Sequence, residues 1–227
     1  MKGIELRDAR VRHGPLEALR GVCLAAPAAA LTVLVGRNGS GRTTALRALA
    51  GTLPLTSGAV LLDGRDITRR PAHERAARGL CFVPDRQAVF PSLTVAENLE
   101  RARPGGDFGR ALSAYPELGP LLPRRAGTLS GGEQRMLALS RALLSGAPVV
   151  LVDEPTQGMA PSVTARTYAL LADLCTRGAC VVVAEQRLPP ALRERARRAV
   201  VTVVVHEVRR GAVVFSAEAA EFRTARE

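Results

Sequence analysis

Tryptophan is absent from this chain of 227 residues, and aromatic residues make up only 3% of it. Because 47% of the residues are nevertheless hydrophobic, the core has to consist mainly of Val, Leu and Ala, in runs such as VVLVD and CVVVAE. This apolar content is sufficient for one substantial core, or for a core with a small additional lobe. We therefore expect one domain over residues 1–227.

Cysteine pairs and long apolar runs are also missing. The four cysteines form no C-x-x-C pair, which disfavours a zinc or redox site; they are Cys23, Cys81, Cys175 and Cys180. Cys23, Cys81 and Cys180 lie in apolar, strand-like runs, so we expect buried free thiols in a reducing cytosol. No window approaches 18 uncharged apolar residues, and the N-terminus lacks the apolar core of a signal peptide. We therefore expect a protein of the cytosol that, if it serves a membrane, does so through a partner.

Lysine is almost absent: Lys2 is a lysine, and all the other residues counted among the 32 Lys and Arg are arginines. The net charge is +11. A basic chain can bind nucleic acid, an anionic membrane surface or phosphorylated ligands. The arginines are scattered, however, with short pairs such as Arg69-Arg70, and alanine is also abundant. This composition is typical of a codon bias, and we expect no nucleic-acid partner.

The order of strand and helix patterns predicts an α/β fold. Short strands fill the first 35 residues, with a turn at Gly14-Pro15, and apolar strands then alternate with helical spacing from residue 31 onward. That alternation favours a mostly parallel sheet. Residues 86–128 break the pattern with a capped helix and Pro- and Gly-rich connections. We therefore expect a core of residues 1–85 and 148–227, with a mostly helical lobe inserted at about 86–147.

A glycine-rich loop, GRNGSGRTT, occupies residues 36–44 between an apolar strand and a helix. Glycines let the backbone approach a ligand, so that successive N–H groups and the helix dipole hold phosphate oxygens. Thr43 offers a hydroxyl to Mg²⁺, and Thr44 offers a second hydroxyl or N–H to a phosphate. The loop departs from the pattern G-x-x-x-x-G-K-[ST] at one position, where Arg42 replaces lysine.

Two further motifs follow. VVLVDEP places Asp153 and Glu154 just beyond an apolar strand, where ligands bind in open α/β sheets. Asp153 can hold Mg²⁺ through water, and Glu154 can polarise an attacking water. LSGGEQR opens a helix at residues 129–135, with Ser130 and Glu133 in capping-box positions. Its paired glycines leave room for a phosphate to reach the N–H groups of the helix.

Together, in this order and spacing, the three motifs resemble those of the ATP-binding-cassette (ABC) ATPases over nearly the whole chain. The resemblance implies a phosphate-loop NTPase fold that binds ATP and Mg²⁺. It also implies two cassettes paired head to tail, as a homodimer or heterodimer, which drive transmembrane permease subunits from the inner face of the membrane. Each ATP would lie between one glycine loop and the Ser130-Gly131-Gly132 segment of the other subunit.

Site roles follow from the same resemblance. The implied catalytic residues are Glu154 and Gln186, and the implied metal ligands are Thr43 and Asp153. The residues expected to contact ATP are His13, Gly36, Arg37, Asn38, Gly39, Ser40, Gly41, Arg42, Thr43, Thr44, Asp85, Ser130, Gly131, Gly132 and Glu133.

Three stretches resemble the ATPases of branched-chain amino acid importers: FVPDRQAVFPSLTVAENL, DEPTQGMAP and VVVAEQR. In that subfamily an acidic residue commonly replaces a loop glutamine, here Asp85, and a glutamine replaces the switch histidine, here Gln186. The base-stacking aromatic residue is replaced by His13, whose ring offers less area than tyrosine.

Arg42 leaves two alternatives open. Arginine keeps the positive charge and can bind phosphate through two N–H groups, but its planar head is bulkier than an ammonium group. The chain is therefore either an ATPase that powers transport, or a nucleotide-binding half of a heterodimer with negligible turnover. A soluble ABC ATPase acting on DNA or ribosomes is a further alternative. Such chains usually carry long coiled coils or fused cassettes, and neither pattern occurs here. The cargo and the direction of transport are not encoded in these motifs.

Overall fold

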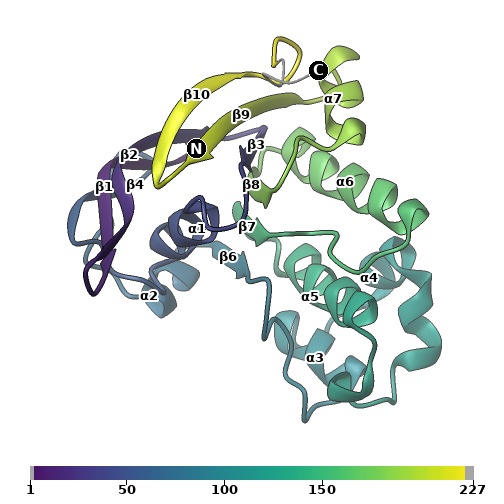
Figure 1. The fold of residues 1–227 in the computed structure, drawn as a ribbon. Helices are drawn as coiled ribbons and strands as arrows, with labels where there is room; N and C mark the ends of the chain where they lie inside the picture. Colours follow the sequence, from purple (N-terminus) through teal and green to yellow (C-terminus); the bar gives the residue numbers. More distant parts are fainter. Residues whose placement is uncertain (1–2, 223–227) are drawn as a thin grey trace.

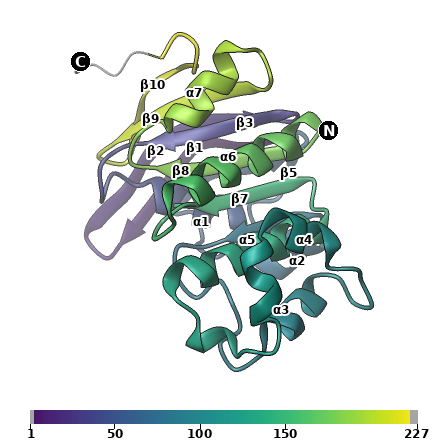
Figure 2. The same ribbon diagram turned by 90° about the vertical axis from the view of Figure 1, so that its right-hand side faces the viewer.

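The structure, a computed structural model that describes residues 3–222, contains two β-sheets with helix α1 (Arg42–Ala50) between them. The other face of the larger sheet is covered by a second group of helices (Figures 1 and 2). Side chains from both sheets and from α1 form one apolar cluster, and the second group of helices forms another with the opposite face of the larger sheet. The glycine loop thus precedes a helix that is packed on two sides.

The larger sheet has the order β10-β9-β3-β8-β7-β6. Its strands are β3 (Ala30–Val35), β6 (Leu80–Val83), β7 (Val149–Asp153), β8 (Cys180–Glu185), β9 (Thr202–Arg209) and β10 (Ala212–Glu218). Five of these pair in parallel, and β10 pairs antiparallel with β9. Strands β3 and β7 are buried along their whole length, as expected for parallel strands covered on both faces.

The smaller sheet is antiparallel and has the order β2-β1-β4-β5. Its strands are β1 (Gly3–His13), β2 (Leu16–Pro27), β4 (Ser57–Leu62) and β5 (Arg65–Asp66). The predicted α/β fold, with a mostly parallel core and N-terminal antiparallel strands, is confirmed.

One detail of the sequence analysis was wrong, because Cys23 is exposed. Buried and outward-facing residues alternate along β2, and Cys23 falls on the outer face between buried Val22 and Leu24. Cys81 is half-buried. Burial raises the pKa of Cys175 to about 12 and that of Cys180 to about 11, so both are inert thiols.

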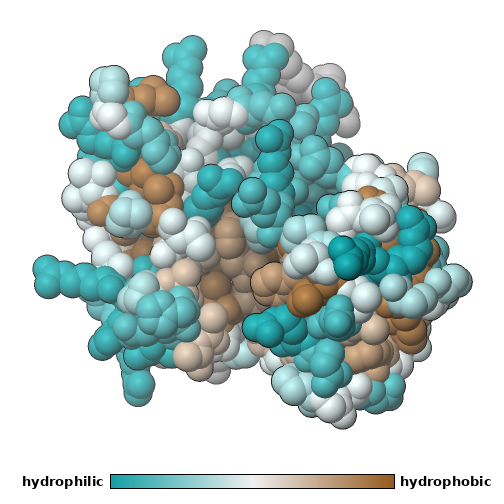
Figure 3. All heavy atoms as spheres, turned by 90° about the horizontal axis from the view of Figure 1, so that it is seen from below, coloured by the Kyte–Doolittle hydropathy of each residue, from teal (hydrophilic) through white to brown (hydrophobic). Residues whose placement is uncertain are grey.

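Several helices gather at the lower right of Figure 1, and we refer to them as the helical lobe. They are α3 (Val95–Ala102), α4 (Gly109–Ala114), the 3₁₀ turns η1 (Pro116–Leu121) and η2 (Ala126–Thr128), and α5 (Gly131–Ser145). Figure 3 shows a hollow between this lobe and the part of the molecule that carries the antiparallel sheet. The division of the chain at residues 86–147 stays a prediction.

The remaining helices are α2 (Ala72–Ala77), α6 (Pro161–Thr176) and α7 (Pro190–Arg197). Helix α6 packs on β3 and β8, and α7 packs on α6 and β9. Within residues 3–222, no helix has the length and apolar character needed to cross a membrane.

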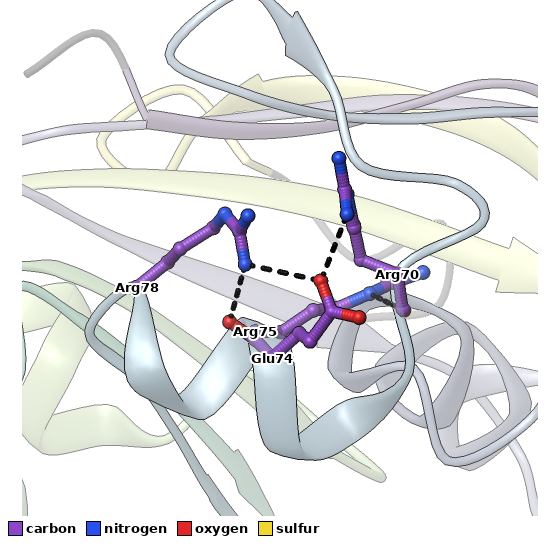
Figure 4. A network of polar contacts seen from close by, with 4 residues as sticks. All are labelled: Arg70, Glu74, Arg75 and Arg78. Carbon is purple, nitrogen blue, oxygen red and sulfur yellow. Dashed lines mark hydrogen bonds and ion pairs between the residues drawn. The ribbon is translucent and has the colours of Figure 1, made fainter.

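Buried Arg75 on α2 anchors the C-terminal end of α1. Its guanidinium donates to the carbonyls of Ala48 and Leu49 at 2.8 and 2.7 Å, and to those of Thr68 and Arg70 at 2.9 and 2.8 Å. The last carbonyls of a helix carry its negative dipole end, so they stabilise a cation there. Glu74 of the same helix instead pairs with exposed Arg70 and Arg78 (Figure 4). Arg75 thereby fixes the helix whose first turn carries the glycine loop.

The two sheets are joined by a buried histidine. His206 on β9 lies 3.0 Å from the carbonyl oxygen of Ala25 on β2, through Nε2, and 2.7 Å from the Ser216 hydroxyl on β10, through Nδ1. Since a carbonyl only accepts, Nε2 carries the proton and the neutral ring accepts from Ser216. Burial lowers the pKa of His206 below its ordinary value of 6.5.

We expect the free energy of unfolding to decrease as the pH falls below about 6.5, because the unfolded chain then takes up a proton that folded His206 does not bind. His206→Gln should lose part of this decrease between pH 7 and pH 5, while costing about 1 kcal/mol at pH 7 through weakened hydrogen bonding. Urea unfolding at both pH values measures this, with exposed His73→Gln as control. The account fails if His206→Gln keeps the full wild-type decrease.

Candidate nucleotide site

The glycine loop runs from the end of β3 to the start of α1. Gly41 is the N-cap of α1 with a φ of 110°, and no side chain caps the helix. A Cβ atom at this position would lie 3.0 Å from the carbonyl oxygen of Ala18 on β2, so both conformation and space require glycine. The loop is fastened by a hydrogen bond of 2.8 Å from the amide of Gly211 to the carbonyl of Ser40. The first-turn N–H groups of α1 are therefore free of side-chain caps in a fixed position, as anion binding requires.

Arg42 is folded into this loop. Its side chain is only 6% exposed, its Nη2 lies 3.4 Å from Asn38 Oδ1, and the same atom lies 3.7 Å from Glu154 Oε1. Its Nη1 is buried and has no hydrogen-bond partner among the described residues. A buried donor without an acceptor costs on the order of 1–3 kcal/mol, so the position favours a ligand that supplies an anionic oxygen.

Carboxylates gather where β6, β7 and β8 end, opposite the loop. Asp153 is the last residue of β7 and is 1% exposed, and Glu154 follows with a φ of 47°. Asp85 follows β6, and Glu185 ends β8. Parallel strands bring their carboxyl ends to one edge of a sheet, which explains this cluster.

Burial is the main cause of the shifted acidities at this edge. It raises the pKa of Asp153, an effect that a hydrogen bond from Thr43 opposes and that the charges of Asp85 and Glu154 increase. Burial also raises the pKa of Glu185, and a hydrogen bond from Tyr168 opposes it. These acids stay ionised more easily when a cation is bound among them.

The residues present fit a nucleoside triphosphate with a divalent cation. Among residues 3–222, buried polar atoms that have no hydrogen-bond partner include Ser40 Oγ, Arg42 Nη1 and Asp153 Oδ2. The first two suit phosphate oxygens and the third suits a cation. No group of three or more His, Cys, Asp or Glu residues in the described part of the chain could hold a metal by itself. Thr43 and Asp153 would therefore share the ion with the nucleotide.

The other expected residues near the loop are more exposed. Asp85 is half-buried, and its Oδ1 lies 3.7 Å from Arg47 on α1. Gln186 follows β8 directly and is exposed, and His13 is exposed at the end of β1. Within the loop, Arg37, Asn38 and Gly39 are exposed and Thr44 is half-buried. The contacts of these residues with a nucleotide stay a prediction.

The predicted capping box at the start of α5 is confirmed. The Glu133 amide donates to the Ser130 hydroxyl at 3.3 Å, and the Ser130 amide donates to the Glu133 carboxylate at 2.8 Å. A Cβ atom on Gly132 would lie 2.7 Å from the carbonyl oxygen of Gly158, whereas one on Gly131 would meet open space. No hydrogen bond or ion pair of Ser130–Glu133 in the described chain reaches the loop at 36–44.

Arg135 is a residue of this site that the sequence analysis did not single out. It lies on α5, is 5% exposed, and donates to the carbonyls of Pro84, Asp153 and Pro155. Burial lowers the pKa of its guanidinium, and the charges of Asp153, Asp85, Glu185 and Glu154 oppose that effect. One cation thus holds together the helix that begins with LSGG and the ends of two strands. Arg135 is the last residue of the LSGGEQR motif, and this position could have indicated its role from the sequence.

Comparisons with known proteins show which family the chain belongs to. The family model described as "ABC transporter" matches residues 19–157, which is more than half of the chain. The chain belongs to the ABC transporter family. It is an ATP-binding cassette, and cassettes of this family are ATPases.

Among curated relatives, the "Probable branched-chain amino acid transport ATP-binding protein LivF" of Archaeoglobus fulgidus is 43% identical over 138 residues, which are 58% of each chain. The "High-affinity branched-chain amino acid transport ATP-binding protein BraG" of Pseudomonas aeruginosa is 33% identical over 191 residues, 80% of this chain and 81% of that protein. The "Cytochrome c biogenesis ATP-binding export protein CcmA" of Paracoccus denitrificans is 36% identical over 187 residues, 81% and 82%.

A solved structure supports the fold of the cassette. A nucleotide-free ATP-binding cassette from an ABC transporter superposes with a TM-score of 0.80 at 22% identity, covering 96% of this chain and 92% of that one. At this level of identity the likeness concerns the fold.

We expect Arg135→Met to lower the free energy of unfolding by about 3 kcal/mol, because three buried carbonyls and four nearby carboxylates lose their cation. Arg141→Met, on the same helix, should cost about 1 kcal/mol, since its guanidinium donates only to the Ala88 carbonyl in the described chain. Urea unfolding of both variants provides the comparison. Equal destabilisation would show that Arg135 does no more than an ordinary half-buried arginine.

Proposed function

We propose that this chain is the ATP-hydrolysing, energy-coupling subunit of a membrane ABC transporter. The observation that carries the proposal is the buried guanidinium of Arg42. It faces Glu154 from inside the glycine loop and keeps one donor without a protein partner. A phosphate chain is the ligand that matches a fixed cation, free helix amides and a nearby magnesium-binding carboxylate.

The proposed roles of the residues follow from their positions. The loop amides and Arg42 bind the phosphates, and Thr43 with Asp153 holds Mg²⁺. Bound ATP would supply the phosphoanhydride bond whose hydrolysis releases energy, and Mg²⁺ would offset the negative charge of the phosphates. Glu154 orients a water molecule and accepts its proton, and Gln186 lies at the edge of the same site.

The proposed partner for the open side of the site is a second cassette, identical or related. The Ser130-Gly131-Gly132 segment makes no hydrogen bond to the loop of its own chain in the described structure. Gly131 faces open space and can therefore approach a phosphate bound to another subunit. This geometry supports a head-to-tail pair in which each nucleotide lies between two subunits.

The helical lobe is the proposed contact for the permease subunit. Phe90, five residues after Asp85, is 41% exposed, and Asn98 fixes its backbone by hydrogen bonds of 2.9 and 3.0 Å. The guanidiniums of Arg101 and Arg141 lie 5.3 and 4.6 Å from the ring centre. Within residues 3–222 neither arginine pairs with a carboxylate. A rigid exposed ring beside unpaired cations supports contact with a partner segment that carries acidic residues.

Import of branched-chain amino acids is the proposed transport function. The names of LivF and BraG support it, as do Asp85 and Gln186 at positions that resemble that subfamily. The likeness to CcmA, named as an export protein, means that the cargo and direction rest on this subfamily resemblance. The proposed location is the inner face of the membrane, reached through the permease.

The contact between Arg42 and Glu154 favours a second candidate function. Glu154 has to release the guanidinium, 3.7 Å away, before it can act on a water molecule. A cassette in which this pair persists would bind ATP with negligible turnover and serve as the non-catalytic half of a heterodimer. The guanidinium of Arg42 is larger than the ammonium group of lysine. Whether it leaves Glu154 free when ATP is bound decides between the two candidates.

Steady-state ATP hydrolysis with Mg²⁺ tests the proposal on three proteins. We expect measurable turnover by the wild type and a turnover about tenfold higher for Arg42→Lys, because the compact ammonium group reaches the phosphates without displacing them. Glu154→Gln should abolish turnover and accumulate an ATP-dependent dimer in size-exclusion chromatography.

The outcomes separate the candidates. Turnover in Arg42→Lys but none in the wild type, alone or with a partner cassette, supports the non-catalytic half. If Arg42→Lys is no faster than the wild type, arginine is a functional substitution and the steric argument is wrong. An inactive Glu154→Gln that forms no dimer with ATP contradicts the proposed pairing.

A further inference from the structure

Two linked hydrogen bonds through the buried hydroxyl of Tyr168 connect the loop that carries Glu154 to the end of the strand that precedes Gln186. Tyr168 on α6 is 2% exposed, and its hydroxyl donates to the carboxylate of Glu185 at the end of β8. The Thr156 hydroxyl, in the loop after β7, lies 3.2 Å from the same Tyr168 oxygen. Because Tyr168 has one proton and gives it to Glu185, Thr156 must be the donor of the second bond. Donation therefore runs in one direction, from the Thr156 hydroxyl to Tyr168 and from Tyr168 to the Glu185 carboxylate.

Both ends of this pair of hydrogen bonds lie beside candidate catalytic residues. Thr156 is two residues after Glu154, and Glu185 immediately precedes Gln186. The backbone also joins the start of the loop after β7 to the end of β8, since the Glu154 amide donates to the Ala184 carbonyl at 3.0 Å. The loop after β7 makes a further turn through the Gln157 amide and the Glu154 carbonyl. Tyr168 thus adds a side-chain link at the place where one strained residue, Glu154 with its positive φ, has to be held.

The alternative is that Tyr168 only stabilises the fold. Tyr115, whose hydroxyl bonds to a residue of the same helix α6, serves as the comparison. Tyr115 in the helical lobe is 1% exposed, and its hydroxyl lies 2.9 Å from that of Thr167, the neighbour of Tyr168 on α6. The Tyr115 hydroxyl has one partner, on α6, whereas the Tyr168 hydroxyl has two partners, one in the loop after β7 and one at the end of β8. Only the Tyr168 bond leads to the catalytic edge. Removing either hydroxyl therefore costs stability, but Tyr168→Phe breaks one more hydrogen bond than Tyr115→Phe does, and that bond is to a carboxylate.

We propose that Tyr168 is a positioning residue for ATP hydrolysis. It holds the loop that carries Glu154 in register with the loop that carries Gln186, so that both side chains face the terminal phosphate together. The proposal rests on the proposed ATPase function. It also makes a claim about loop order that is independent of turnover.

The test compares Tyr168→Phe with Tyr115→Phe in the full chain. We expect Tyr168→Phe to lower kcat about tenfold, because small displacements of catalytic groups are costly, and to leave KM for ATP within about twofold. Tyr115→Phe should also lower the free energy of unfolding, though by less because it breaks a single neutral hydrogen bond, and it should keep kcat within about twofold of the wild type. Thr156→Val, which breaks the hydrogen bond to Tyr168, should resemble Tyr168→Phe, and the double variant should be no slower than the slower single variant.

Amide hydrogen exchange keeps the inference testable if the wild type has no turnover. Peptides that span residues 154–159 should exchange at least tenfold faster in Tyr168→Phe than in Tyr115→Phe, since the loop loses its side-chain link. An inactive wild type that shows this difference contradicts the proposed ATPase function and supports the positioning role. Equal exchange in the two variants, or equal losses of kcat, would overturn the inference.

Discussion

The burial of one guanidinium inside a phosphate-binding loop is the interaction on which the site depends. Arg42, the first residue of α1, is held between Asn38 and Glu154. A buried cation needs compensation. Here Glu154 supplies part of it, and a bound phosphate can supply the rest. Around this group the fold fixes both sides: Gly41 and Gly211 hold the loop, and Arg75 holds the far end of α1.

A second buried cation balances the opposite side of the site. Arg135 connects α5 to the carbonyls at the ends of β6 and β7, within the field of four carboxylates. The helix that begins with LSGG is therefore tied to the strand ends that carry Asp85 and Asp153. A displacement of that helix by a partner subunit would act directly on the carboxylate that is proposed to hold Mg²⁺. Tyr168 provides a comparable link between the loops after β7 and β8.

Much of the fold could be predicted because local patterns agree with it. Apolar runs such as those around Val150 and Val182 become buried parallel strands, and the spacing of Ser130 and Glu133 becomes a capping box. Cys23 was misjudged, since an apolar neighbourhood does not reveal which face of a strand a residue occupies. Arg135 and Tyr168 escaped prediction because their partners are 18 to 51 and 12 to 17 residues away in sequence.

The central claim is that the loop at residues 36–44 binds a triphosphate with arginine in place of lysine. Titration calorimetry with Mg²⁺ and a non-hydrolysable ATP analogue tests it most directly. The account predicts a saturable heat of binding for one site per chain, with a dissociation constant well below about 1 mM. Binding should be lost in Arg42→Met that remains folded by thermal unfolding. No heat of binding at millimolar analogue, or undiminished binding by Arg42→Met, would contradict it.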